Sequence, residues 1–126
     1  MVLICGVLDD GGRVLFLIRR NQQFEQIELP YFETNKNSDF VSELATEFKR
    51  QTNIDGEILE IIHKTRYNSG SRKRKKWDDV LIFKVNAKNR SVRIGSEFSG
   101  FRWLTLEDAK KQKISKKFEW LKRLDD

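Results

Sequence analysis

The 126-residue chain contains a single cysteine, Cys5, and a single proline. One cysteine excludes an intramolecular disulfide framework and favours a reducing, cytoplasmic (intracellular) location. The longest apolar runs, such as 14–18, are far too short to span a bilayer. The N-terminus also lacks the basic region and long apolar stretch of a signal peptide. We therefore expect neither membrane insertion nor a membrane partner.

Apolar and charged residues are both plentiful, at 38% and 35% of the chain, and nine Phe and three Trp are among the apolar ones. This is enough apolar area for a domain of this length to bury a core without a disulfide or a structural zinc. We expect residues 1–126 to form one domain, with Cys5 inside its core.

Acidic residues are absent from 64–76, a stretch that holds seven lysines and arginines. The whole chain has 25 Lys and Arg against 19 Asp and Glu, a net charge of +6, so this stretch accounts for the basic excess. Such a segment attracts phosphates, and it also keeps a small protein soluble. Trp77 follows directly and suits either stacking on a base or covering the core.

The pattern of apolar residues and turn residues predicts a mixed α and β chain. Asp-Asp-Gly-Gly at 9–12 indicates a hairpin turn, and Pro30 restricts the residue before it to extended geometry. Val41, Leu44, Ala45 and Phe48 recur at helical spacing. The predicted order is strands at 2–8, 13–18 and 27–29, a loop to 38, a helix from Ser38 or Asp39 to Asn53, strands at 57–62, 79–85, 91–94 and 101–104, and two helices opened by Thr105 and Ser115.

Glu28-Leu29-Pro30 is followed by a loop and a capped helix that carries Glu47. In order and spacing this segment resembles the Nudix hydrolases, whose box G-x5-E-x7-R-E-U-x-E-E-x-G-U, where U is aliphatic or aromatic, aligns with 28–54 without a gap. Glu47 alone remains of the helix glutamates. The other polar and glycine positions of the pattern hold Tyr31, Phe32, Ser38, Thr46, Arg50, Gln51 and Asn53.

The segment from Ser96 to Leu104, which reads SEFSGFRWL, looks like the diadenosine tetraphosphate hydrolases and their near relatives. The resemblance implies that Glu97 assists the metal or the attacking water and that Phe101 stacks on a base. It also implies that the basic residues from Arg72 to Lys76 contact a polyphosphate. The implied fold is α/β (α+β): the Nudix fold, an α/β/α sandwich with a mixed β-sheet between helices.

The metal site of the family needs several oxygen ligands for Mg²⁺ or Mn²⁺, and carboxylates on one helix face supply them. Here Glu47, Arg50 and Gln51 carry no net charge together, so a divalent ion should bind poorly. A relocated set of Glu43, Glu47 and Glu97 is the alternative, with Glu47 and Glu97 as catalytic residues. Over a working metal site we favour a solvated ion-pair face of Glu43, Glu47 and Arg50. A sharper hypothesis is that the Arg50 guanidinium lies where the metal would be and holds a phosphate directly.

Three functions stay open. The leading one is a Nudix-fold protein that binds a nucleotide or a nucleic-acid phosphate chain with little or no hydrolysis and without a cofactor. The second is a divergent Mg²⁺- or Mn²⁺-dependent pyrophosphohydrolase that acts on nucleoside polyphosphates. The third is an interaction or scaffold domain whose basic loop meets RNA or an acidic protein. The ligand-binding residues expected for the leading function are Arg50, Arg72, Lys73, Arg74, Lys75, Lys76 and Phe101.

Overall fold

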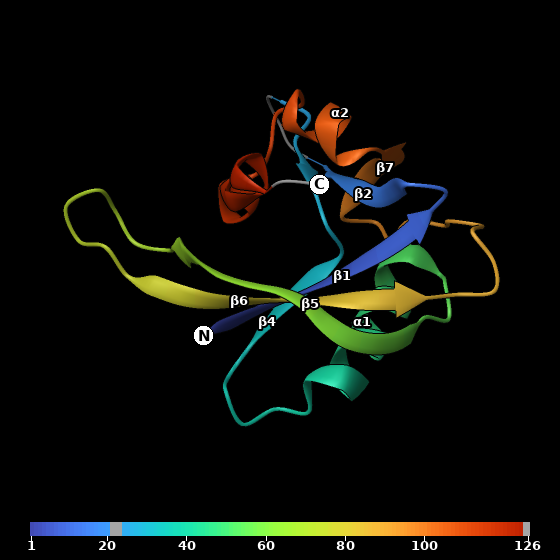
Figure 1. Cartoon of the computed structure of the whole chain (residues 1–126), viewed down its shortest axis with the longest axis horizontal. Coiled ribbons are helices and arrows are strands. Elements are labelled where there is room, and N and C mark those ends of the chain that lie inside the picture. The colour runs from blue at the N-terminus through green and yellow to red at the C-terminus, as the bar shows by residue number, and fades with distance from the viewer. Residues whose placement is uncertain (21–23, 125–126) are drawn as a thin grey trace.

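The computed structural model describes residues 1–20 and 24–124, and more of these residues lie in strands than in helices (Figure 1). The elements, in chain order, are β1 (Val2–Asp10), β2 (Arg13–Arg19), β3 (Ile27–Glu28), β4 (Tyr31–Thr34), α1 (Phe40–Thr52), β5 (Glu57–Asn68), β6 (Trp77–Asn86), β7 (Phe98–Leu104), α2 (Leu106–Lys110) and the 3₁₀ helix η1 (Lys116–Arg123). None of the described helices is long and apolar enough to cross a membrane.

β1 is the strand on which the mixed sheet is built, because it pairs with β2, β4 and β6. It runs parallel to β6 and antiparallel to β4 and β2. β2 also pairs with β3 and β7, and β5 pairs with the outer side of β6. The strand order is β3-β2-β1-β6-β5, with β4 attached to β1 and β7 attached to β2.

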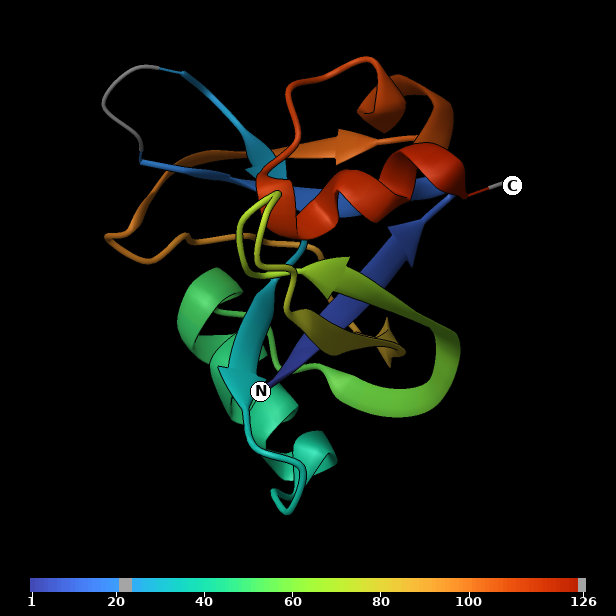
Figure 2. The same ribbon diagram turned by 90° about the vertical axis from the view of Figure 1, so that its left-hand side faces the viewer.

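Helices cover both faces of this sheet, with α1 on one side and α2 and η1 on the other (Figures 1 and 2). Successive residues of a strand point to opposite faces, and β2 shows the result clearly. Leu15 and Leu17 belong to the core cluster of Phe48 on α1, whereas Phe16 and Ile18 belong to that of Phe118 on η1. The expected α/β/α sandwich with a mixed sheet is therefore confirmed.

The element ends that are predicted most accurately from the sequence are those with a turn residue or a helix cap. Gly11 and Gly12 have positive φ angles of 62° and 85°, which close the β1–β2 hairpin. Asp39 caps α1 by accepting a hydrogen bond from Ser42 N, and Asn53 ends it in the left-handed conformation with φ 61°. Thr105 caps α2 in the same way, through Asp108 N.

Four predictions about elements are wrong. The segment after Pro30 is not a loop to 38, because its first four residues form β4 against β1. The predicted strands at 57–62 and 101–104 are too short, because β5 runs on to Asn68 and β7 begins at Phe98. The strand predicted at 91–94 is absent from the described residues, and Arg93 N donates instead to Thr52 O at the end of α1, where carbonyls lack intrahelical partners.

The last helix is a 3₁₀ helix, and Ser115 makes no side-chain cap hydrogen bond to it. Side chains three residues apart eclipse in this geometry, so Phe118 and Leu121 pack into the core together. Trp120 is buried as well, and its ring stacks on His63 of β5 with centroids 6.0 Å apart. Trp120 therefore covers β5, the edge strand of the sheet.

Cys5 provides a test of this packing, because it is fully buried in β1 between β4 and β6. Burial, and to a smaller extent the charge of Glu28, raises the pKa of its thiol well above the ordinary value. We expect alkylation by iodoacetamide at pH 8 to be at least about a thousand-fold slower in buffer than in urea, since it requires unfolding. A Ser91→Cys variant supplies an exposed thiol as control, which should be alkylated rapidly in buffer. Rapid alkylation of both thiols of that variant, Cys5 as well as the new one, would contradict the packing.

Candidate functional site

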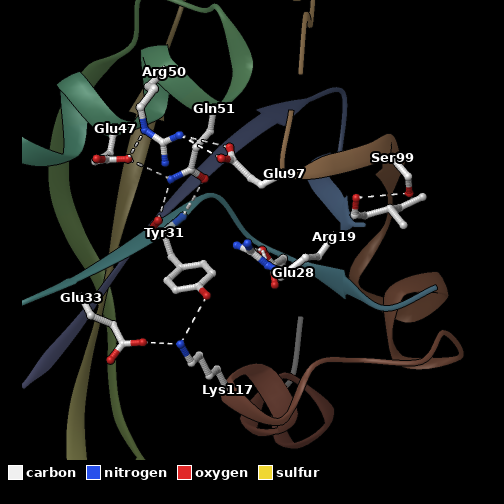
Figure 3. A network of polar contacts seen from close by, with 11 residues as sticks. Arg19, Glu28, Tyr31, Glu33, Glu47, Arg50, Gln51, Glu97, Ser99 and Lys117 are labelled. Atoms are coloured by element: carbon white, nitrogen blue, oxygen red, sulfur yellow. Dashed lines mark hydrogen bonds and ion pairs between the residues drawn. The ribbon is translucent and has the colours of Figure 1, made fainter. Parts of the chain in front are cut away.

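The last two turns of α1 place three polar side chains on one face, toward β4 and the segment that precedes β7 (Figure 3). Glu47, Arg50 and Gln51 lie three and four residues apart, which is the spacing of neighbours on a helix surface. The segment before β7 contributes Glu97, and Gly95 N holds this segment to the helix by donating to Gln51 O. These four side chains form the candidate site.

Arg50 lies between two carboxylates. Its Nε donates to Glu47 Oε2 at 2.8 Å, and its Nη1 donates to Glu97 Oε2 at 3.0 Å and Oε1 at 3.2 Å. The hydrogen bonds to Glu97 and Glu47 raise the pKa of the guanidinium further above its ordinary value. Arg50 therefore stays charged, and it joins α1 to the loop that carries Glu97. The pair of Glu47 and Arg50 expected from the sequence is confirmed, and Glu97 is added to it.

Gln51 is buried and bonds to the backbone of Tyr31 in both directions. Its Oε1 accepts from Tyr31 N at 3.3 Å, and its Nε2 donates to Tyr31 O at 2.7 Å. The same Nε2 lies 3.3 Å from Glu47 Oε2, to which it also donates. An ionised carboxylate at this position could accept but could not donate. Gln51 therefore connects α1 to β4 through hydrogen bonds, and it also donates a hydrogen bond to Glu47.

An ion pair between the half-buried Arg19 and the buried Glu28 lies next to this group, and no local pattern of the sequence indicates it. Glu28 Oε1 accepts from Arg19 Nη2 at 2.6 Å and from Arg19 Nε at 2.9 Å. The Arg19 guanidinium lies over the rings of Phe98 and Tyr31, at 5.1 and 5.7 Å from their centroids. Burial raises the pKa of Glu28, and the hydrogen bond to Arg19 opposes that rise.

A third pair connects β4 to η1. Lys117 Nζ donates to Glu33 Oε1, and it lies 3.3 Å from the hydroxyl oxygen of Tyr31, which also accepts from it. Lys117 is 84 residues from Glu33 in the chain, so no local pattern could indicate the contact. Figure 3 shows Tyr31 between this pair and the group around Arg50.

The residues present do not fit a bound divalent ion. Glu47 Oε2 and both carboxylate oxygens of Glu97 accept hydrogen bonds from Arg50. Across residues 1–20 and 24–124, no group of three or more His, Cys, Asp or Glu is placed to hold a metal. Glu43 is exposed and lines an open groove of about 480 Å³ together with Glu33 and Glu47. The metal role proposed for Glu43 and Glu47 stays a prediction.

The expected ligand-binding residues do not form one cluster. Arg72 to Lys76 lie in the loop that ends the long β5–β6 hairpin, apart from α1 and β7 (Figure 1). Phe101 lies on β7 opposite Leu17 of β2, and Leu17 is also opposite Glu28 of β3. Residues opposite each other share a face of the sheet, so Phe101 and the pair of Arg19 and Glu28 are on one face. Phe101 is 39% exposed there, which leaves its ring accessible.

Exchanging Gln51 for Glu tests the link between α1 and β4. The new carboxylate would face Tyr31 O and Glu47 without a proton to donate, so we expect Gln51→Glu to lower the free energy of unfolding by about 1–3 kcal/mol at pH 7. The loss should shrink as the pH falls toward 5, since a protonated carboxyl donates again. Urea denaturation measures both effects. Thr46→Glu adds the same charge at an exposed position of α1, and an equal loss there would contradict the explanation.

No protein-family model matches the chain, and no curated protein matches it either. Solved structures do match. The MutT protein from Methanosarcina mazei Go1 has a TM-score of 0.75 and 18% identity, over 98% of this chain and 91% of that one. The E. coli dihydroneopterin triphosphate pyrophosphohydrolase has a TM-score of 0.70 and 18% identity, and the match covers 98% of this chain and 93% of that one.

A third match is the Nudix domain of Shewanella oneidensis NrtR, solved in complex with ADP-ribose. Its TM-score is 0.70 and its identity 15%, over 98% of this chain and 84% of that one. At such low identities the likeness concerns the path of the backbone, and it extends over nearly the whole chain in all three cases. This chain has the fold of the Nudix hydrolases.

Proposed function

We propose that this Nudix-fold chain is a binding protein for a nucleotide or for the phosphate chain of a nucleic acid, with little or no hydrolysis of its ligand. The observation that carries the proposal is the position of the Arg50 guanidinium, which is hydrogen-bonded to Glu47 and Glu97 at once. These are the two carboxylates that the resemblance to the family assigns to the metal and the attacking water.

A guanidinium in this position works against hydrolysis in two ways. It repels a divalent cation, and it occupies carboxylate oxygens that the cation would need as ligands. Gln51 donates to the same Glu47 Oε2 as Arg50 does, and it brings no negative charge of its own to attract a cation. Without a metal, Arg50 can supply positive charge to a pyrophosphate, but it does not bind and orient an attacking water as a metal ion would.

The same guanidinium has donors to offer a ligand. Within the described residues, the hydrogen bonds of Arg50 use Nε and Nη1, which leaves the two N–H groups of Nη2 for a phosphate oxygen. Because two carboxylates flank Arg50, we expect weaker phosphate binding than at an unpaired arginine. Phe101 offers an accessible ring on the sheet for the base. The ADP-ribose held by the Shewanella Nudix domain supports a nucleotide as the class of ligand.

Turnover is the direct test of the catalytic half of the proposal. We expect no Mg²⁺- or Mn²⁺-dependent hydrolysis of diadenosine tetraphosphate, ADP-ribose or nucleoside triphosphates. The reason is that Arg50 and Gln51 hydrogen-bond to Glu47 Oε2, which a metal would need as a ligand. Phosphate and nucleotide release would be measured beside a Glu47→Gln variant purified in the same way. A rate that this single change abolishes would show instead a rebuilt metal site around Glu47, with Glu43 and Glu97 as its candidate partners.

Two variants at position 50 test the role of the guanidinium. Arg50→Glu removes the cation and adds a carboxylate next to Glu47 and Glu97, so we expect it to gain Mn²⁺ binding, detected by electron paramagnetic resonance. Arg50→Gln removes the cation without adding a carboxylate and should gain weaker Mn²⁺ binding than Arg50→Glu. Metal-free binding of ADP-ribose, followed by calorimetry, should weaken in both variants, by roughly 1.5–3 kcal/mol for the loss of a hydrogen bond from a charged group.

Unchanged ADP-ribose affinity in Arg50→Gln would remove Arg50 from the binding site. Failure of Arg50→Glu to bind Mn²⁺ would show that the guanidinium is not what keeps a metal out. Thermal denaturation of both variants, compared with the parent chain, separates these outcomes from a loss of folding.

A further inference from the structure

The end of the β5–β6 hairpin, together with η1, forms a second surface that is separate from the site around Arg50. We call it the hairpin-tip surface and define it by the loop 72–76 and by Trp77, Lys116 and Arg123. Figure 2 shows the loop passing in front of η1. Lys116 Nζ donates to Gly70 O at 3.0 Å, which confirms that the loop and the helix are in contact.

The loop has a defined shape because polar side chains at its base satisfy its backbone. Asn68 Oδ1 accepts from Gly70 N and Lys76 N, at 2.9 and 3.0 Å. Ser71 Oγ accepts from Arg74 N at 2.9 Å. The backbone is thus held from within, and the basic side chains are not needed to hold it.

These basic side chains are exposed and free. In the part of the chain that the structure describes, no side chain from Arg72 to Lys76 forms a hydrogen bond or an ion pair. The contrast with the candidate site is sharp, because Arg19, Arg50 and Lys117 are each bonded to a carboxylate there. The five cations of the loop 72–76 are therefore available to a ligand, whereas those of the candidate site already have carboxylate partners.

A groove of about 240 Å³ lies beside the loop, between the hairpin and η1. Its lining combines aromatic and basic side chains, namely Trp77, Trp120, Lys116 and Arg123, with Glu119 as its acid. Trp120 is buried, but Trp77 is 55% exposed, an unusual position for so large an apolar ring. An indole of this kind, next to five free cations, presents both a stacking face and a phosphate-binding edge.

We propose that the hairpin-tip surface binds single-stranded nucleic acid, with phosphates against Arg72 to Lys76 and an unpaired base stacked on Trp77. A single strand fits better than a duplex, since a paired base does not offer its face to Trp77. It fits better than an acidic protein, since carboxylates would use the cations and leave the indole in water. The proposal rests on the proposed phosphate-chain binding, but it does not require the site around Arg50.

The test is binding of a fluorescent 12-nucleotide oligouridine, followed by anisotropy over a range of salt concentrations. Log affinity should fall linearly with log salt, with a slope of about −0.7 for each phosphate contacted. Trp77→Ala should weaken binding by roughly ten-fold, the effect of losing one stacked base. The pair Lys73→Glu and Lys75→Glu should weaken it by roughly ten-fold or more and flatten the salt dependence.

Matched controls separate a local effect from a general one. Phe24→Ala removes another exposed aromatic ring, and Lys88→Glu with Lys111→Glu makes the same change of net charge at exposed positions elsewhere. Both controls should bind within about two-fold of the parent chain, since screening limits distant charges. Equal losses in controls and tip variants would overturn the proposal, and so would unchanged binding by Trp77→Ala.

Two further measurements test whether the surface prefers a single strand and whether it acts independently of the site around Arg50. A 12-base-pair duplex bound as tightly as the single strand, or a poly-glutamate peptide bound more tightly, would overturn the proposal in favour of a purely electrostatic surface. Calorimetry with ADP-ribose on the tip variants tests the other site separately. Retained ADP-ribose binding with lost oligouridine binding supports two independent sites, whereas loss of ADP-ribose binding by the tip variants would overturn their independence.

Discussion

The structure of the candidate site depends on one cation held by two anions: Arg50 between Glu47 and Glu97. This contact connects the last turn of α1 to the segment before β7, which lies 47 residues further along the chain. Without the guanidinium, two carboxylates would face each other across the gap and repel. In a metal-dependent hydrolase a divalent ion offsets such repulsion, because it too is a cation shared by carboxylates. Arg50 meets the same need with a cation of the chain itself, which is the basis of the proposed binding role.

Charge pairing divides the surface into two regions of different chemistry. Around Tyr31, the cations Arg19, Arg50 and Lys117 are each paired with a carboxylate, so their charges are largely cancelled. At the hairpin tip the cations have no such partners, and attraction of a polyanion dominates there. The basic loop belongs to the hairpin rather than to the site around Arg50 (Figure 1). A basic segment therefore does not reveal, from sequence alone, which site it serves.

Local signals predicted the fold well, whereas contacts between distant segments were missed. Asp39 and Asn53 fix the ends of α1 through their own caps, so the sequence around them is sufficient. β4 was missed because its four residues are strand only where β1 lies beside them. Residues 91–94 were wrongly predicted as a strand because their apolar alternation suits one, although Arg93 N donates to Thr52 O at the end of α1 instead of to a neighbouring strand. At the site, the pair of Glu47 and Arg50 was predictable from helical spacing, but the shared contact with Glu97 was not.

Several of the residues that depart from the Nudix pattern contact one another or the same neighbours. Tyr31 stands where the pattern has glycine, and its ring packs edge-on against Phe118 at 5.3 Å. Its backbone is bonded on both sides by Gln51, and its hydroxyl accepts from Lys117. A glutamate at 51 would lose half of that backbone contact, and a glycine at 31 would leave a gap beside Phe118. Reverting one of these positions therefore leaves the other contacts in place: Arg50→Glu would free Glu47 from the guanidinium, but Gln51 would still donate to Glu47 Oε2 and hold the backbone of Tyr31.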